Sequence, residues 1–348
     1  MTLSRAAVEQ ALSQIQDPAG HALTSNERIE SLVIDGATIR LTLRIAAAEA
    51  KAFADVQKAA EAALLALPEI SRALVILTAE KTASAPHAQG SARDIPGVRH
   101  MVAVASGKGG VGKSTLAANL ALALRRKGLA VGLVDADIYG PSVPRLMGVS
   151  RKPEFIDGKM LKPIEAHGLK VMSIGFMVEE ESPLIWRGPM IDSALTQMMR
   201  EVAWGDLDVL IVDMPPGTGD AQLTMAQKMP LDGAIIVSTP QDLALIDARK
   251  GLTLFAKADV KVFGLVENMS TFICPACGFR CDIFGHGGAR REAEKLGLDF
   301  LGEIPLHMAI RVAADAGAPS VVADPDGPHA AAYGAVAERL WAKLAARI

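Results

Sequence analysis

The sequence is poor in aromatic residues, in net charge and in long apolar runs. Phe, Trp and Tyr together make up 4% of its 348 residues, too few for a surface that stacks nucleobases. A net charge of -3 at pH 7 leaves no basic footprint for nucleic acid. No apolar run approaches the roughly 18 residues that a membrane-spanning helix needs. We therefore expect neither nucleic acid nor membrane as a partner.

Cysteine is also scarce, and its placement is informative. The three cysteines, Cys274, Cys277 and Cys281, lie close together and leave none elsewhere for a disulfide framework. The N-terminal residues lack the apolar core of a secretory signal and include an early acid, Glu9, so we expect a cytoplasmic protein. Clustered cysteines in such a chain indicate metal or redox chemistry.

The first 97 residues predict a small domain and a linker. Half of all residues in the chain are apolar, enough for two domains with their own cores. Residues 1–80 predict an α+β domain in the order α-β-β-α-β, with a hairpin turn at Asp35-Gly36. Residues 81–97 contain Pro86, Gly90 and small polar residues, and they predict a flexible linker.

Residues 98–348 alternate apolar strands with helices. Continuous apolar strands separated by helices predict an α/β fold with a mostly parallel sheet that helices cover on both faces. Ligands of such sheets bind at the carboxyl ends of the strands. The predicted strands span residues 101–105, 129–134, 169–174, 208–213, 233–238, 261–266 and 299–303.

A phosphate-binding loop follows the first of these strands. It matches G-x-x-x-x-G-K-[ST] and consists of Gly107, Lys108, Gly109, Gly110, Val111, Gly112, Lys113, Ser114 and Thr115. Glycines in such a loop let backbone N–H groups turn toward a polyphosphate, while Lys113 reaches the outer phosphates and Ser114 ligates Mg²⁺. The alternative is a Gly-rich turn without a ligand. The strand before the loop and the apolar-striped helix after it favour the nucleotide site.

Carboxylates end two further strands. Asp213 ends the strand 208–213 and is our candidate for the residue that holds the hydration shell of Mg²⁺. The segment after it, residues 214–220, is typical of a loop that senses a γ-phosphate through backbone N–H groups, Gly217 among them. Asp135 and Asp137 follow the strand 129–134, and either could instead cap the turn after it.

Besides Lys113, the loop contains another lysine, Lys108, which an ordinary Walker loop does not need. With it, the loop resembles the deviant K-G-G-x-G-K-[ST] form of a group of dimeric ATPases that includes the nitrogenase iron protein, MinD, ParA and the Mrp/ApbC carriers. The resemblance implies that Lys108 crosses a homodimer interface to the partner's nucleotide, in the manner of an arginine finger. A solvated lysine on a loop is the alternative.

The same resemblance implies roles for other residues. It implies that the bound nucleotide is ATP and that the reaction is ATP hydrolysis. It also makes Asp137 the residue that orients the attacking water, with Asp135 nearer the metal shell. Asn268, after the strand 261–266, then lies against the adenine, because an amide can both donate to and accept from a base edge.

Cys274 and Cys277 form a C-x-x-C turn a few residues after Asn268. The spacing lets two thiolates face one metal centre, but structural zinc and [4Fe-4S] clusters normally need four protein ligands. A face-to-face homodimer resolves the shortfall, since two such turns offer four thiolates to one bridging cluster. Alternatively, Cys274, Cys277, Cys281 and His286 could bind zinc within one chain.

Taken together, these motifs and the following Asp282-Ile283-Phe284-Gly285 resemble the Mrp/ApbC family of iron-sulfur cluster carriers over roughly residues 96–325. The resemblance implies that Cys274 and Cys277 hold a labile [4Fe-4S] cluster at a homodimer interface for delivery to apo-proteins, alongside assembly factors. The first domain is similar to the small iron-sulfur assembly accessory domain. Where that domain can carry a reactive cysteine, this chain has Ala46-Ala47-Ala48-Glu49, which excludes an independent thiol role.

Two rival functions stay open at this point, and a third finds no support. A MinD-like positioning ATPase would use the C-terminal stretch as an amphipathic helix against a membrane or a partner, although such an apolar stripe also suits core packing. The stripe comprises Tyr333, Val336, Ala337, Leu340, Trp341, Leu344 and Ile348. An ATPase with a structural zinc knuckle is the second rival. A metabolic kinase would need a substrate-binding acid or a lid, and neither is evident.

Overall fold

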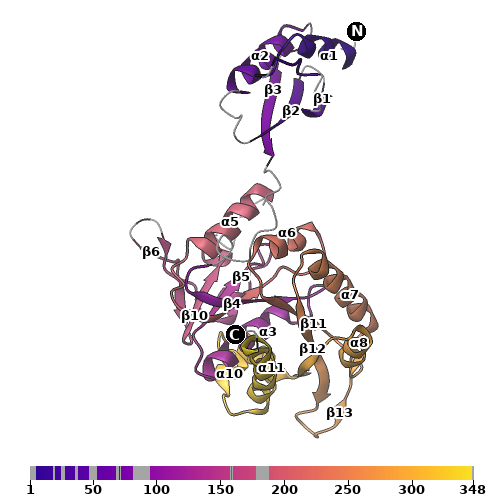
Figure 1. Cartoon of the computed structure of the whole chain (residues 1–348). Helices are drawn as coiled ribbons and strands as arrows, with labels where there is room; N and C mark the ends of the chain where they lie inside the picture. Colours follow the sequence, from indigo (N-terminus) through magenta and orange to yellow (C-terminus); the bar gives the residue numbers. More distant parts are fainter. Residues whose placement is uncertain are drawn as a thin grey trace. The chain divides into compact units, whose positions relative to one another are not determined.

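The structure is a computed structural model that describes residues 5–18, 20–24, 28–35, 38–46, 53–67, 70, 72–80, 95–156, 158, 160–177 and 188–346 (Figure 1). The chain forms two compact units, residues 1–90 and 91–348. The predicted linker falls largely on residues 81–94, outside the described residues. The predicted domain boundaries therefore stay a prediction.

The first unit has the element order α-β-β-α-β. It comprises α1 (Arg5–Ser13), β1 (Ile29–Asp35), β2 (Thr38–Ala46), α2 (Phe53–Leu65) and β3 (Arg72–Glu80). Strand β1 runs antiparallel to β2 and β3 runs parallel to it. Apolar residues at alternate positions of β2 are buried with residues of both helices in one core. Gly36 of the predicted turn lies outside the described residues.

The second unit is built on a nine-stranded sheet. Its strands follow the order β13-β12-β11-β4-β10-β5-β9-β8, and β14 also pairs with β12. Seven of them are mutually parallel and correspond to the seven predicted strands, which confirms the predicted α/β fold. These are β4 (Val98–Ala105), β5 (Val131–Asp135), β9 (Leu169–Ser173), β10 (Leu207–Asp213), β11 (Gly233–Ser238), β12 (Val262–Ile273) and β14 (Phe300–Leu306).

Four short strands were not predicted. β8 (Ile164–Ala166) and β13 (Arg280–Cys281) add to the sheet in antiparallel orientation. β6 (Phe155–Ile156) and β7 (Met160–Leu161) form a separate hairpin. At two or three residues each, these strands are too short to show a periodic apolar pattern.

Helical layers cover the sheet. Helices α3 (Lys113–Arg126), α10 (Ser320–Ala323) and α11 (Pro328–Ala345) pack on one another, and α6 (Asp220–Lys228), α7 (Asp242–Lys257) and α8 (Gly288–Leu296) form a second group (Figure 1). Because helices cover the strands, β5 and β11 are buried along their whole length. The remaining helices are α4 (Val143–Leu146), α5 (Gly188–Arg200), α9 (Met308–Asp315) and the 3-10 turn at Ile174–Phe176.

The C-terminal helix α11 uses its apolar stripe inside the protein. Tyr333, Val336, Leu340 and Leu344 are each at most 1% exposed, and α11 packs against α3 and β14. The stripe is therefore a core-packing face, the second of the two alternatives that its sequence left open. Within the described ranges, no helix combines the length and the apolar content needed to cross a membrane.

Asn119 fastens α3 to α10 and provides a test of this packing. Its Nδ2 donates to the carbonyl of Thr115 (2.9 Å), its Oδ1 accepts from the N–H of Val321 (3.0 Å), and the residue is 1% exposed. Asn119→Ala leaves a buried N–H without a partner, so we expect the free energy of unfolding to fall by about 1–3 kcal/mol in urea titrations. Glu338→Gln removes one exposed ion pair and serves as the control, with a change of at most about 1 kcal/mol. Equal midpoints for the two variants would contradict this role.

Candidate functional site

The predicted nucleotide residues come together at the carboxyl ends of the central strands. β4 leads through residues 106–112 into α3, and β5 and β10 flank one another beside it. In the register of the parallel strands, Asp213 is the partner of Asp135 on one side and of Val104 on the other. The sheet thus places both acids next to the root of the phosphate-binding loop.

Neighbouring elements hold the loop tightly at two glycines. A Cβ atom at Gly107 would lie 2.1 Å from the carbonyl oxygen of Asp247 in α7. Gly112, the N-cap of α3, adopts φ 80°, and a Cβ there would lie 2.2 Å from Nδ2 of Asn268. Only glycine fits either position, since both spaces are filled and the second needs a left-handed backbone.

Lys113 is buried among the acids. Its Nζ atom lies 2.6 Å from Oδ1 of Asp213, 3.8 Å from Oδ2 of Asp137 and 3.1 Å from Oγ of Ser114. The lysine is 6% exposed and Asp213 is fully buried. A buried ammonium with these carboxylate partners can turn to a phosphate oxygen only by giving up contacts that it already makes.

The donors around Asp213 fit Mg²⁺. Oδ2 of Asp213 is buried without a hydrogen-bond partner in the described part of the chain. Burial raises the pKa of Asp213, and the neighbouring Lys113 and the Ser114 hydroxyl oppose the rise. An unpartnered carboxylate oxygen beside a hydroxyl is the hard oxygen donor set that Mg²⁺ prefers.

Asp135 holds the loop that follows β5. Its Oδ1 accepts from the N–H of Asp137 (3.1 Å), and its Oδ2 accepts from the N–H of Val143 (3.1 Å) and from Oγ of Ser173 (3.0 Å). Burial, and then the neighbouring Asp213 carboxylate, raise the pKa of Asp135 to about 7. These contacts are those of a loop-capping residue, the alternative that its sequence left open. A place for Asp135 in the metal shell stays a prediction.

Asp137 sits at the mouth of this cluster. It is 8% exposed, and its carboxylate faces Lys113. Burial raises its pKa, which Lys113 opposes. A carboxylate this close to the loop lysine is suitably placed to orient a water at the outer phosphate, and that role stays a prediction.

The loop after β10 is held by its backbone and by a residue that the sequence did not single out. Gly217 donates its N–H to the carbonyl of Ser106 (3.1 Å), so this N–H would have to change partners to contact a phosphate. Gln222 in α6 is 2% exposed, and its Nε2 donates to the carbonyl of Pro215 (3.1 Å). A glutamine just inside a helix is common on surfaces, so only its burial marks it as a support for this loop.

A cavity of about 390 Å³ adjoins the loop at Gly112 and Thr115. Asn268 lines it and donates its Nδ2 to the carbonyl of Val111 (2.8 Å), which fixes the orientation of the amide. Met269, the next residue, also lines the cavity and adopts a left-handed φ of 57°, and the pairing of β12 with β14 shifts between Asn268 and Phe272. The cavity offers room for a nucleoside next to the loop, and the contact of Asn268 with an adenine stays a prediction.

The cysteines lie on the hairpin of β12 and β13. The N–H of Cys274 donates to the carbonyl of Phe279 (2.9 Å), and the N–H of Gly278 donates to the carbonyl of Cys274 (2.8 Å). Backbone N–H groups of Ala276 and Cys277 and the Cys277 thiol bond to the Cys274 sulfur and lower its pKa. Cys277 is exposed and Cys274 is half-buried, so the turn presents two thiol groups at or near the surface.

The histidine of the proposed one-chain zinc site lies elsewhere. His286 is grouped with Glu267 and Glu303, and this is the one group of three or more potential ligand side chains found among the described residues. Cys281 lies on β13, is also half-buried, and pairs with Phe272 of β12. The set of Cys274, Cys277, Cys281 and His286 is therefore not assembled in this structure.

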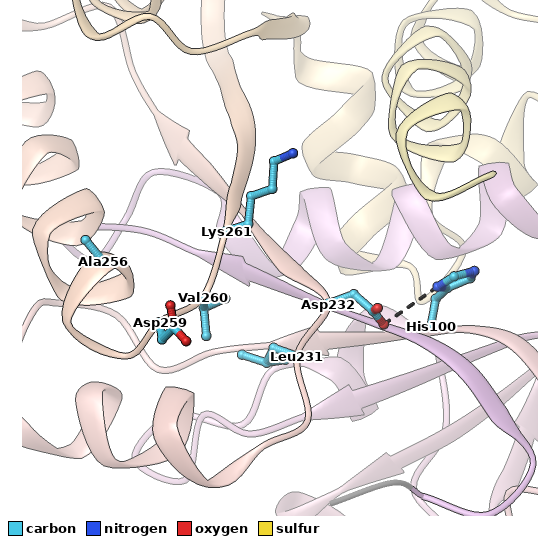
Figure 2. Close-up of a pocket in the computed structure, with 7 residues that line it drawn as sticks. All are labelled: His100, Leu231, Asp232, Ala256, Asp259, Val260 and Lys261. Carbon is cyan, nitrogen blue, oxygen red and sulfur yellow. Dashed lines mark ion pairs between the residues drawn. The ribbon is translucent and has the colours of Figure 1, made fainter. Parts of the chain in front are cut away.

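A separate cavity of about 640 Å³ lies at the amino ends of the strands, on the side of the sheet away from the phosphate-binding loop. Figure 2 shows His100 of β4 facing Asp232, which precedes β11. Lys261, which precedes β12, lies on the side of Asp232 away from His100 (Figure 2). The Nδ1 of His100 lies 3.7 Å from Oδ2 of Asp232. Because these residues mark the amino ends of the strands, this cavity is remote from the nucleotide chemistry.

The chain is similar to known proteins over most of its length. A family model described as NUBPL iron-transfer P-loop NTPase matches residues 97–341, and one described as iron-sulfur cluster assembly protein matches residues 5–75. An iron-sulfur cluster carrier protein of Pseudomonas fragi is 53% identical over 72% of this chain and 88% of its own length. One from Escherichia coli K12 is 51% identical over 72% and 68%. A solved nucleotide-binding protein of Archaeoglobus fulgidus in complex with ADP is 40% identical, with a TM-score of 0.58 over 67% of this chain and 90% of that one.

Proposed function

Because the chain belongs to the NUBPL family of iron-transfer P-loop NTPases, we propose that this ATPase carries a [4Fe-4S] cluster between two copies of itself and delivers it to apo-proteins. The observation that carries the proposal is the position of β12. Asn268 of this strand bonds to the phosphate-binding loop, and the turn of Cys274 and Cys277 begins where the strand ends. One strand thus links the proposed nucleotide site to the proposed cargo site.

The nucleotide chemistry rests on the buried lysine and the acids around it. Lys113 exchanges its contact with Asp213 for one with the outer phosphates of ATP, and the backbone of residues 107–115 surrounds the phosphate chain. Ser114 and Asp213 would hold Mg²⁺, the aspartate through water, and the ion supplies charge neutralisation for the phosphate oxygens when bound. Asp137 orients the attacking water, while Lys108 of the partner copy stabilises the charge that develops on the phosphate.

The cargo site needs two copies of the chain. Each copy offers two thiols in one turn, and a [4Fe-4S] cluster is normally held by four. The surface position of Cys277 allows two turns to meet, and the lowered pKa of Cys274 favours the thiolate that binds iron. A cluster held between two exposed turns is accessible to the thiols of a client protein, as a carrier requires.

We assign the remaining organisation to the same function. Residues 1–80 form the iron-sulfur assembly accessory domain, residues 81–97 the linker, and residues 98–348 the ATPase with the cysteine turn. The match of the assembly-protein family to residues 5–75 supports the first assignment. We infer that the homodimer works in the cytoplasm with apo iron-sulfur proteins and assembly factors as its partners.

Anaerobic reconstitution with iron and sulfide tests this function. We expect the wild-type protein to gain about four iron atoms per dimer, the visible absorption of a [4Fe-4S] cluster and a dimeric mass. Cys274→Ala and Cys277→Ala should each lose the cluster and the cluster-dependent dimer. Cys281→Ala is the matched control, and it should keep both.

Two results would speak against the proposal. One zinc ion per chain that is unaffected by reconstitution and is lost in Cys274→Ala and Cys277→Ala would identify a structural zinc knuckle. Binding to liposomes that depends on ATP and not on the cysteines would identify a positioning ATPase.

A further inference from the structure

Two glutamates lie side by side on neighbouring strands next to the cysteine hairpin. Glu267 of β12 and Glu303 of β14 are register partners in a parallel pair. Glu267 is fully buried, and its oxygens accept from the N–H groups of Gly287 (2.9 Å) and Ala289 (2.8 Å). Like charges directly opposite one another in a sheet are destabilising, so this position favours a cation between the two carboxylates.

His286 lies between the two carboxylates without a hydrogen bond to either. Its Nδ1 is 3.9 Å from Oε1 of Glu267, and its Nε2 is 3.9 Å from Oε2 of Glu303. Both distances exceed those of a hydrogen bond. The Nδ1 atom is moreover buried without a partner among the described residues. The imidazole therefore has a free ligand atom at a place where two carboxylates converge.

We propose that His286, Glu267 and Glu303 bind a divalent first-row transition-metal ion, at a site distinct from the cysteine turn and from the Mg²⁺ site. One potential ligand atom from each residue lies within 4.8 Å of the other two. The two 3.9 Å separations involve different ring nitrogens, so one nitrogen of His286 would bind the ion together with an oxygen of each glutamate. Ligand atoms about 2.1 Å from one ion are roughly 3.0–4.2 Å apart, so only small side-chain shifts are needed. Each carboxylate oxygen of Glu267 has a lone pair left after its backbone hydrogen bond. One imidazole and two carboxylates are a suitable set for Zn²⁺, Co²⁺, Fe²⁺ or Mn²⁺.

A Co²⁺ titration of the full chain tests the site independently of the cluster function. Cys274, Cys277 and Cys281 are first changed to Ser, so that thiolate ligands are excluded. We expect one Co²⁺ per chain, with weak d-d absorption bands and without thiolate-to-cobalt charge transfer, and we expect Zn²⁺ to displace it. His286→Ala and Glu303→Gln should each weaken binding by about 100-fold or more, since even changes around the ligands of a metal cost 10–100-fold. Wild-type protein with alkylated cysteines replaces the serine variant if that variant does not fold.

Glu294→Gln is the matched control, because this exposed glutamate of α8 lies outside the group, and its affinity for Co²⁺ should equal that of the parent. Glu267 is not changed, since its carboxylate also caps α8. Failure to bind Co²⁺ would overturn the proposal and leave His286 as a neighbour of the two glutamates without a metal. Binding that both His286→Ala and Glu303→Gln retain would overturn it as well. Neither result bears on the cluster, which the cysteine variants test separately.

Discussion

Lys113→Met should abolish ATP hydrolysis and also destabilise the protein, whereas Lys108→Met should abolish hydrolysis alone. Lys113 is the buried cation that lies 2.6 Å from Asp213. Without it, Asp213 remains buried with neither of its oxygens opposite a positive charge, and breaking a buried ion pair from one side costs about 3–5 kcal/mol. Loss of the phosphate contact should slow hydrolysis by about 10³-fold or more.

Lys108 is the matched comparison within the same loop. It is half-buried and no ion pair of its side chain is recorded in the described part of the chain, so its removal should leave the unfolding midpoint nearly unchanged. If it acts across the dimer, hydrolysis falls by about 10³-fold, as for an arginine finger, while ATP is still bound. Phosphate release, binding of a fluorescent ATP analogue and urea unfolding distinguish the two variants. Equal losses of stability for both lysines would show that the contact of Lys113 with Asp213 is not what holds this region.

Gly107→Ala should displace the phosphate-binding loop and remove nucleotide binding. The added Cβ would lie 2.1 Å from the carbonyl oxygen and 2.2 Å from the carbonyl carbon of Asp247. Both are backbone atoms of α7, so no side chain can move aside. Overpacking of this kind costs about 1–3 kcal/mol and occasionally more, and we expect the upper end here.

Gly334→Ala provides the opposite expectation. Gly334 lies in α11 with no atom within 4 Å of an added Cβ. Alanine should therefore stabilise this helix by about 0.5–1 kcal/mol. Calorimetric binding of ATP and thermal unfolding check both variants. Normal ATP affinity in Gly107→Ala would mean that α7 moves away from the loop at little cost.

The sequence was most informative where a pattern is both long and buried. The seven parallel strands were predictable because helices cover the sheet, which makes most of them nearly continuous apolar runs. The phosphate-binding loop was predictable because its chemistry needs a fixed spacing of Gly, Lys and Ser. The stripe of α11 shows the limit of such patterns, since core packing and membrane binding require the same spacing of apolar residues.

Contacts between distant segments could not be predicted. The pairing of Asp135 with Asp213 depends on the order and register of strands that lie about 80 residues apart in the chain. The supports that Ser173 and Gln222 give to the loops have no local signal, because each is a common polar residue until its burial is known. The pair of Glu267 and Glu303 is of the same kind, since it arises from strand register alone.

The left-handed backbone of Met269 separates β12 into two pieces. One piece reaches the nucleoside cavity at Asn268, and the other leads to the sulfur atoms of the hairpin. An L-residue occupies this conformation at a cost, so it persists only because the surrounding structure imposes it. The cavity beside the phosphate-binding loop and the cysteine turn are thus joined through Met269, and any molecule bound in the cavity would lie against this residue.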